Sequence, residues 1–276
     1  MKIRIPLFLK NLSYRSSVQE LVRVFHLRSI ARRLYCRWAW PPNDIFQFEI
    51  NSLRAQFYIQ TPDDLRMMES ERIKEQRMME LLISNLKPGD AVYDVGASVG
   101  LYTIVLAKIV SNKGQVIAFE PNRQSYNRLR DNLRLNGLTN ARLFCKALGE
   151  ENRKEKLYTA KGRLSTLIRP LRGIETDYEF IEMVEGDRLR EAENLPLPQL
   201  VKIDVEGYEY AVIQGLRQTL RQPTCKLVCC EIHPQFLPVN AKPEMILDLL
   251  KSLGFSQIEI HPCRGRIEYH AICFKP

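Results

Sequence analysis

From residue 91 onward, short apolar runs typical of buried strands alternate with longer helical patterns, and this alternation constrains the fold more than any other feature. The strand-like runs lie at 91–95, 115–119, 141–145, 199–204 and 226–232, and two shorter strands are expected near 155–159 and 179–185. The helical patterns lie at 99–110, 123–136, 208–220 and 243–253, ahead of a terminal strand pair at 256–262 and 266–274. Strands that alternate with helices predict an α/β fold with a doubly wound, mostly parallel sheet.

The chain ahead of this alternation divides into two further segments. A basic arm, 1–42, has a helical pattern that ends at two prolines, since proline cannot continue a helix. A lead-in segment, 43–90, reads as a strand pair followed by a helix over 64–86. We therefore expect three parts, with the main domain covering 91–276. Within that domain, 161–197 is the least regular region, and we expect a loop over the active face there.

The positive charge is concentrated in the arm. Residues 1–40 have nine basic side chains and one acidic side chain, a net charge of +8, whereas the whole chain has a net charge of +9. An enzyme that acts on nucleic acid is expected to carry basic surface around the reaction site, because phosphate contacts dominate affinity. The distribution therefore argues against a nucleic-acid partner. The arm is predicted to be a helix with solvated arginines, and the alternative is a peripheral contact with an anionic membrane or a protein.

Cysteine usage and hydropathy indicate the compartment. The seven cysteines make an odd count, lie mostly in apolar runs and follow no secretory signal, and no stretch has the length of a membrane-spanning helix. We expect a cytoplasmic protein, at most peripheral to a membrane. A zinc site is disfavoured for the cysteines nearest to His233, because they lie in or beside an apolar strand. These are Cys225, Cys229 and Cys230.

A glycine-rich turn, DVGASVG at 94–100, joins the first strand of the main domain to its first helix. Such a turn lets the backbone and the free N–H groups of the new helix approach a ligand. Asp94 places a carboxylate where it could meet an ammonium group rather than a pyrophosphate. The spacing Gly-x-x-x-Gly also lacks the middle glycine of the dinucleotide fingerprint. Glu120, at the end of the next strand, is placed to hold ribose hydroxyls, which any nucleoside cofactor would need.

Acidic residues and a histidine gather at the carboxyl ends of two later strands. The stretch KIDVEGYE, 202–209, alternates so that Lys202, Asp204 and Glu206 project to one side. The next strand ends at His233, and open α/β sheets bind ligands at that edge. His233 oriented by an acid, or Asp204 directly, could take a proton from a hydroxyl. The same residues have the donors of a divalent cation site, but no further Asp or Asn motif completes one, so a site without metal is favoured.

Together the four motifs resemble one methyltransferase family. DVGASVG, AFEPN, KIDVEGYE and the strand end EIHP look like those of the FkbM-type methyltransferases, over roughly residues 70–274. The resemblance implies a Rossmann-like, seven-stranded class I sheet with a final antiparallel strand, and S-adenosyl-L-methionine as cofactor. The residues it implies are Asp94, Gly96, Ser98 and Gly100 around the methionine part, Glu120 at the ribose, and Lys146 and Ala147 along the adenine, with Ala97 and Asn122 as further cofactor-binding residues. Ser98 departs from the family, which commonly has asparagine there, and serine has a shorter reach.

The motifs favour a methyltransferase that O-methylates a hydroxyl of a small molecule or glycan, with Asp204, Glu206 and His233 as the catalytic candidates. An NAD-linked oxidoreductase is an alternative, against which the missing middle glycine counts. A non-catalytic cofactor-binding module with a docking arm is another, but such a module would be expected to lose the strand-end acids. A base-methylating enzyme is disfavoured, because DVEG occupies the place of its (Asp or Asn)-Pro-Pro-aromatic turn. The sequence leaves the acceptor and the oligomeric state open.

Overall fold

The computed structural model describes residues 35, 39–160, 165–167, 176–263 and 267–276. These residues divide into two compact units. One contains Ile59–Met68 and the described residues up to Phe46, and the other contains Gln47–Tyr58 and Glu69–Pro276. The basic arm, 1–42, lies almost entirely outside the described residues, so its helical structure stays a prediction.

In the first unit, a reciprocal cap starts helix α4 (Pro62–Lys74), after the short helix η1 (Pro42–Asp44). The backbone N–H of Asp64 donates to Thr61 Oγ1 at 3.2 Å, and the N–H of Thr61 donates to Asp64 Oδ2 at 2.7 Å. This capping box satisfies two backbone donors that a helix start would otherwise leave without partners.

The strand pair predicted for the lead-in segment is confirmed. Strands β1 (Ile45–Ile50) and β2 (Leu53–Tyr58) form a two-stranded sheet. The connecting residues, Asn51 and Ser52, have φ angles of 44° and 68°. Two successive residues with positive φ make a tight hairpin turn whose twist matches that of the strands.

The helix predicted over 64–86 is bent into two. Helix α4 ends at Lys74 and α5 covers Gln76–Ser84. The N–H of Glu75 still donates to the Glu71 carbonyl at 2.9 Å, so the helical path continues through the bend. Glu75 is buried there, and its carboxylate accepts a hydrogen bond from the Tyr102 hydroxyl at 2.6 Å. Neither glycine nor proline marks this point, which is why the pattern predicted one helix.

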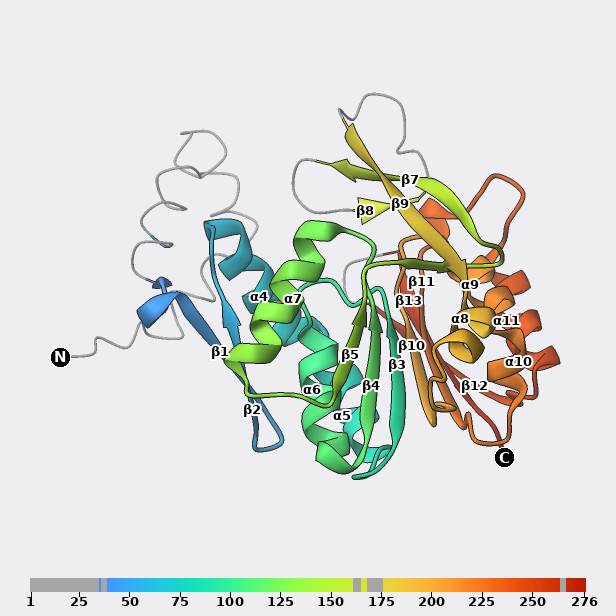
Figure 1. Ribbon diagram of the computed structural model, residues 1–276, viewed down its shortest axis with the longest axis horizontal. Coiled ribbons are helices and arrows are strands. Elements are labelled where there is room, and N and C mark those ends of the chain that lie inside the picture. The colour runs from blue at the N-terminus through green and yellow to red at the C-terminus, as the bar shows by residue number, and fades with distance from the viewer. Residues whose placement is uncertain (1–34, 36–38, 161–164, 168–175, 264–266) are drawn as a thin grey trace, which may run out of the picture. The chain divides into compact units, whose positions relative to one another are not determined.

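The predicted class I sheet is confirmed in the second unit (Figure 1). Its seven strands lie in the order β12-β13-β11-β10-β3-β4-β5. Their bounds are β3 (Ala91–Val95), β4 (Gln115–Phe119), β5 (Ala141–Phe144), β10 (Leu200–Ile203), β11 (Leu227–Ile232), β12 (Gln257–Pro262) and β13 (Tyr269–Phe274). Neighbouring strands from β11 to β5 pair in parallel, whereas β13 pairs antiparallel with both β11 and β12. The carboxyl ends of the five parallel strands therefore meet at one edge.

Helices cover both faces of this sheet. Helix α6 (Leu101–Val110) packs on β3 and β4 with α5 against it, and α7 (Arg123–Leu135) packs on β5 (Figure 1). On the opposite face, α9 packs on β11, and the helices that pack on α9 are α8, α10 and α11. Their bounds are α8 (Gly186–Ala192), α9 (Glu209–Gly215), α10 (Arg217–Arg221) and α11 (Pro243–Ser252). The helix predicted over 208–220 is thus two helices that break at Leu216.

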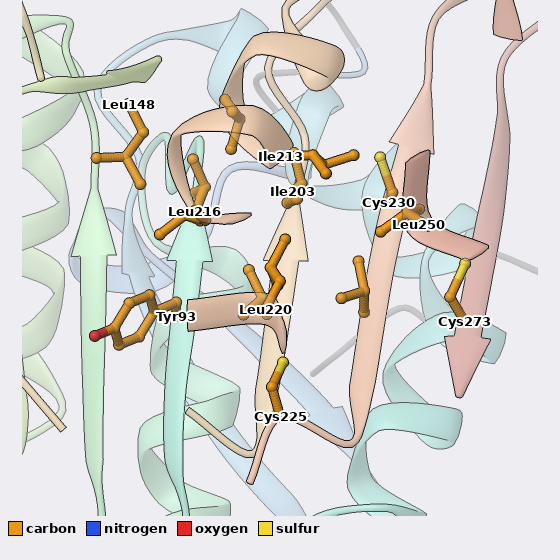
Figure 2. Packing of buried hydrophobic residues seen from close by; sticks show 14 of the residues in the cluster. Tyr93, Leu148, Ile203, Ile213, Leu216, Leu220, Cys225, Cys230, Leu250 and Cys273 are labelled. Carbon is orange, nitrogen blue, oxygen red and sulfur yellow. The ribbon is translucent and has the colours of Figure 1, made fainter. Parts of the chain in front are cut away.

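The main core lies between the sheet and α9, α10 and α11. Figure 2 shows Tyr93 and Ile203 from the strands among Leu216, Leu220 and Leu250 from the helices, all buried. Three cysteine thiols lie in the same cluster. They are Cys225, Cys230 and Cys273. Their burial in the apolar core is consistent with the apolar runs in which the sequence places them.

The short strands predicted near 155–159 and 179–185 are confirmed and are longer than expected, so the loop predicted over 161–197 is shorter than the pattern indicated. Strand β9 (Thr176–Glu185) joins a second sheet in the order β6-β9-β7-β8, and α8 follows it directly. The other strands are β6 (Ala147–Gly149), β7 (Arg153–Ala160) and β8 (Ser165–Thr166). Ile181 and Met183 point into the small core of this sheet, whereas Phe180 is exposed, as expected for a strand with one buried face. Residues 161–164 and 168–175 lie outside the described residues.

Among the described residues, no helix combines the length and the apolar character that crossing a membrane requires.

Candidate active site

The glycine turn lies between β3 and α6 and packs directly on the end of β10. Gly96 has a φ of +82°, and the N–H groups of Gly96 and Ala97 both donate to the Phe119 carbonyl at 3.0 Å. A Cβ atom on Gly96 would lie 1.8 Å from the backbone oxygen of Asp204. Only glycine fits this position, because both its backbone angle and its contact exclude a side chain. The turn and the end of β10 therefore form one tightly joined structure.

Glu120 follows β4 and links the turn to the start of α7. Its Oε2 accepts from the N–H of Ser98 at 2.7 Å, and its Oε1 accepts from the N–H of Asn122 at 2.8 Å. Burial raises the pKa of Glu120 to about 7, against the effect of these two hydrogen bonds. Each carboxylate oxygen can accept a second hydrogen bond. The rigidly held carboxylate keeps acceptor capacity for hydroxyl groups, and its contact with a ribose stays a prediction.

Ser98 adopts a backbone conformation that explains why asparagine suits this place. Its φ is +50°, in the left-handed region that asparagine enters more readily than serine.

Asp94 is completely buried at the end of β3. Its Oδ2 accepts from Thr103 Oγ1 at 2.5 Å, and its Oδ1 lies 3.7 Å from Lys202 Nζ. Burial raises the pKa of Asp94, and the Lys202 ammonium opposes that shift. Oδ1 has no hydrogen-bond donor among the described residues. The carboxylate thus already lies beside one ammonium group, that of Lys202, and its contact with the ammonium group of a bound amino acid stays a prediction.

The other predicted cofactor residues have partners on neighbouring elements. Asn122 caps α7 by accepting from the N–H of Ser125 at 2.9 Å, and its amide donates to Glu179 on β9 at 2.8 Å. Lys146 forms an ion pair with Glu182, also on β9. Ala147 is buried at the start of β6. Their contacts with a cofactor stay predictions.

Asp204, Glu206 and His233, which we name the acid–histidine group, lie close together as the motifs suggest. His233 Nε2 is 3.4 Å from Glu206 Oε2 and 3.8 Å from Asp204 Oδ1. Their three ligand-type atoms lie within 4.8 Å of one another, so the group could also hold a cation. Glu206 has a φ of +53°, a conformation that costs about 1 to 3 kcal/mol for a residue with a side chain. Such strain is typical of functional sites.

Lys202 keeps Asp204 ionised. Its buried ammonium lies 3.2 Å from Asp204 Oδ2 and donates to the Gly96 carbonyl at 3.4 Å. Burial by itself would raise the pKa of Asp204, but Lys202 and His233 hold it below its ordinary value. Asp204 is therefore a carboxylate at neutral pH, although it is largely withdrawn from water.

Glu209, which sequence reasoning did not select, orients the histidine. This completely buried carboxylate, in the first turn of α9, lies 2.8 Å from His233 Nδ1 through Oε1. Nδ1 therefore carries a proton, and Nε2 faces Glu206. Glu209 is the last acid of the KIDVEGYE motif. Because it is far from His233 along the chain, the motif does not indicate that the two side chains meet.

The carboxylates around His233 determine which groups carry protons. Burial disfavours the imidazolium, but Glu209, Asp204 and Glu206 together outweigh that effect and raise the pKa of His233 to about 10. The pKa of Glu206 is raised to about 8 by burial and by nearby carboxylates, while His233 opposes the shift. Near neutral pH the site thus combines an imidazolium, an ionised Asp204 and a Glu206 that readily gains or loses a proton.

Comparisons with known proteins agree with this arrangement. A model of the methyltransferase FkbM domain matches residues 94–256. The hexuronic acid methyltransferase AglP of Haloferax volcanii is 29% identical over 191 residues, which is 67% of this chain and 73% of AglP.

Solved methyltransferase structures are more distant. An S-adenosylmethionine-dependent O-methyltransferase of Thermotoga maritima has a TM-score of 0.47 and 14% identity, with 88% of this chain and 81% of that chain covered. A putative methyltransferase of Streptococcus mutans in complex with S-adenosylhomocysteine has a TM-score of 0.47 and 10% identity, with 74% and 98% covered. Because the FkbM domain match covers more than half of the chain, this protein belongs to the FkbM methyltransferase family and is an S-adenosylmethionine-dependent enzyme.

Proposed function

We propose that this methyltransferase methylates a hydroxyl group of a sugar or a similar small molecule. The observation that carries the proposal is the position of the acid–histidine group at the glycine turn, where Gly96 packs on the Asp204 backbone and His233 lies beside Asp204 and Glu206. A hydroxyl must lose its proton when it is methylated, and this group offers a proton acceptor. The hexuronic acid named for AglP supports a sugar-type acceptor.

Glu206 is the best candidate for the general base. S-adenosylmethionine, when bound, supplies a methyl group on a sulfonium, so the protein has to position the acceptor and remove its proton. His233 is a poor base because its pKa of about 10 keeps it protonated, and the lowered pKa of Asp204 makes that carboxylate weakly basic. The pKa of Glu206, about 8, lies close to neutral pH, where a general base is most effective.

Asp204 and His233 then have supporting roles. Asp204, held ionised by Lys202, accepts a hydrogen bond from the acceptor hydroxyl and orients it. His233, held by Glu209, keeps its imidazolium beside Glu206 and stabilises the ionised form of that carboxylate. This division of roles uses each residue in the protonation state that its surroundings favour.

The presence of a base favours a neutral nucleophile. An ionised carboxylate nucleophile would need no base, whereas a hydroxyl has to give up its proton, here to Glu206. On this view a hexuronic acid would react at a hydroxyl. Competition between neutral sugars and uronic acids in the methyl-transfer assay distinguishes the two classes of acceptor.

We also propose a cytoplasmic location with the basic arm, 1–40, free to contact an anionic surface or partner. All the cysteines among the described residues are free, as a reducing compartment requires. The net charge of +8 within the arm supports the contact.

Cofactor binding is tested by replacing Glu120 with glutamine. We expect the dissociation constant of S-adenosylmethionine to rise by about 10- to 100-fold, because hydrogen bonds to a charged group contribute about 1.5 to 3 kcal/mol. Calorimetric titration of the full chain measures this, with Glu193→Gln, an exposed acid paired with Arg142, as the matched control. Equal binding by both variants, or tighter binding of NAD than of S-adenosylmethionine, would contradict the assignment.

The pH dependence of the reaction tests the base. Because Glu206 acts in its ionised form, kcat is expected to rise with pH through about 8 and then to level off. Release of S-adenosylhomocysteine at saturating substrate measures kcat over two pH units on either side of that value. A rate that falls through this interval would exclude Glu206 as the base.

The highest pH at which the rate can be measured depends on the stability of the folded protein. The raised pKa values of His233 and His270, both about 10, mean that their contribution to stability is complete below the ordinary histidine pKa. It is lost as the pH rises through about 10. Melting curves recorded in the same buffers show where a fall in rate reflects unfolding instead.

A further inference from the structure

A second cluster of metal-ligating side chains lies beside the acid–histidine group. Cys263 Sγ lies 3.4 Å from His270 Nδ1 and 3.8 Å from Glu231 Oε1. Glu231 is on β11, Cys263 follows β12, and His270 is on β13. Strand pairing places Glu231 opposite His270, and the N–H of Cys263 donates to the Glu268 carbonyl at 3.2 Å. These backbone hydrogen bonds therefore fix the relative positions of the Cα atoms of all three residues.

The distances match those of a tetrahedral metal site. Zinc binds thiolate sulfur at about 2.3 Å and imidazole nitrogen or carboxylate oxygen at about 2.0 to 2.2 Å, so that neighbouring ligand atoms are separated by about 3.5 Å. The sulfur of Cys263 is within a few tenths of an ångström of that separation from both other ligands, at 3.4 and 3.8 Å. One ligand atom of each of the three residues lies within 4.8 Å of the others.

The surroundings of His270 also suit a metal ligand. While Nδ1 faces Cys263, Nε2 faces the carboxylates of Glu75 and Glu231, each at 3.5 Å. Metal-binding histidines commonly donate their second ring N–H to a carboxylate, which orients the ring. Glu75 is itself held by the Tyr102 hydroxyl at 2.6 Å. A carboxylate that could orient the ring, that of Glu75, thus already lies near Nε2.

The burial of the cluster and the types of its side chains also favour a metal site. Glu75, Glu231 and His270 are each less than one tenth exposed. Two carboxylates and a thiol face one imidazole, so the cluster offers sulfur, nitrogen and oxygen donors together. A thiolate ligand favours zinc and similar transition metals over magnesium or calcium.

We propose that Glu231, Cys263 and His270 bind a divalent transition-metal ion, most suitably zinc, with the fourth position left to water or another oxygen ligand. Glu231 Oε1 also lies 3.8 Å from His233 Nε2, so the ion would adjoin the acid–histidine group without using its side chains. The inference rests on the geometry of the cluster and stands whether or not the proposed hydroxyl acceptor is correct.

Cobalt(II) is the probe for this site. The full chain, freed of metal with a chelator, is titrated with Co²⁺, and a thiolate-to-cobalt charge-transfer band with one ion per chain is expected. Cys263→Ser should lose that band and bind Zn²⁺ at least about 10-fold more weakly. Cys145→Ser, which changes a partly exposed thiol beside Pro121, is the matched control and should retain both properties.

The melting temperature and the metal binding of Asp204→Asn test further whether the ion lies at Cys263. Zn²⁺ should raise the Tm of the wild type and of Cys145→Ser but not that of Cys263→Ser, since a ligand stabilises only the state that it binds. Asp204→Asn should bind metal like the wild type. Wild-type protein that binds Co²⁺ without a thiolate band would overturn the proposal. So would a loss of binding in Asp204→Asn with retention in Cys263→Ser, which would place the ion in the acid–histidine group.

Discussion

Replacing Glu206 by glutamine is expected to lower kcat by about 10²- to 10⁴-fold, the usual contribution of a general base. The amide keeps the size of the side chain, but it cannot accept a proton near neutral pH. The dissociation constant of S-adenosylmethionine should stay close to that of the wild type, because the predicted cofactor contacts lie in the glycine turn and at Glu120. Single-turnover assays with quenched sampling separate the chemical step from binding.

Two comparison variants make this result specific. Glu191→Gln changes an exposed acid paired with Arg190 and should leave kcat unchanged. Asp204→Asn should raise KM for the acceptor as well as lower kcat, since Asp204 is proposed to hold the hydroxyl. Wild-type kcat in Glu206→Gln together with a complete loss in Asp204→Asn would assign the base to Asp204 instead.

Gly96→Ala is expected to abolish detectable cofactor binding and to destabilise the protein by at least about 2 kcal/mol, from left-handed strain and steric overlap. The new methyl group would lie 1.8 Å from the Asp204 backbone oxygen, at a φ of +82°. The turn has to move away from β10 to relieve this contact, so its N–H groups and the acid–histidine group lose their alignment. For a chain of this size the Tm should fall by about 4 to 8 °C.

Gly137→Ala is the matched control for that experiment. Gly137 also has a positive φ, +64°, but a Cβ atom there meets nothing within 4 Å. This variant therefore measures the conformational strain of alanine alone, and its cofactor binding should match that of the wild type. Equal losses of stability and binding in both variants would mean that the contact between Gly96 and Asp204 has no effect of its own.

The local sequence pattern was sufficient to predict most helices and strands and several residues of the site. The alternation of apolar runs and helical patterns determined the α/β fold, because period and length identify buried strands and helices without reference to distant residues. The position of acids after strands, as at Glu120 and Asp204, indicated the binding edge, since the carboxyl ends of parallel strands meet there. Errors in the elements came where local signals were weak, as at the bend of Glu75 and at the break of Leu216 between α9 and α10.

By itself, the sequence thus determined the strand-and-helix frame, the glycine turn and the strand-end acids. Tertiary structure alone decided which side chains meet: Glu209 with His233, and Lys202 with Asp94. It also brought Cys263 to Glu231 and His270, although Cys-x6-His resembles no metal motif. The physical reason is that these pairs come from different strands and helices, and their distances depend on strand order, pairing register and helix packing. None of these is encoded in the spacing of residues along one segment.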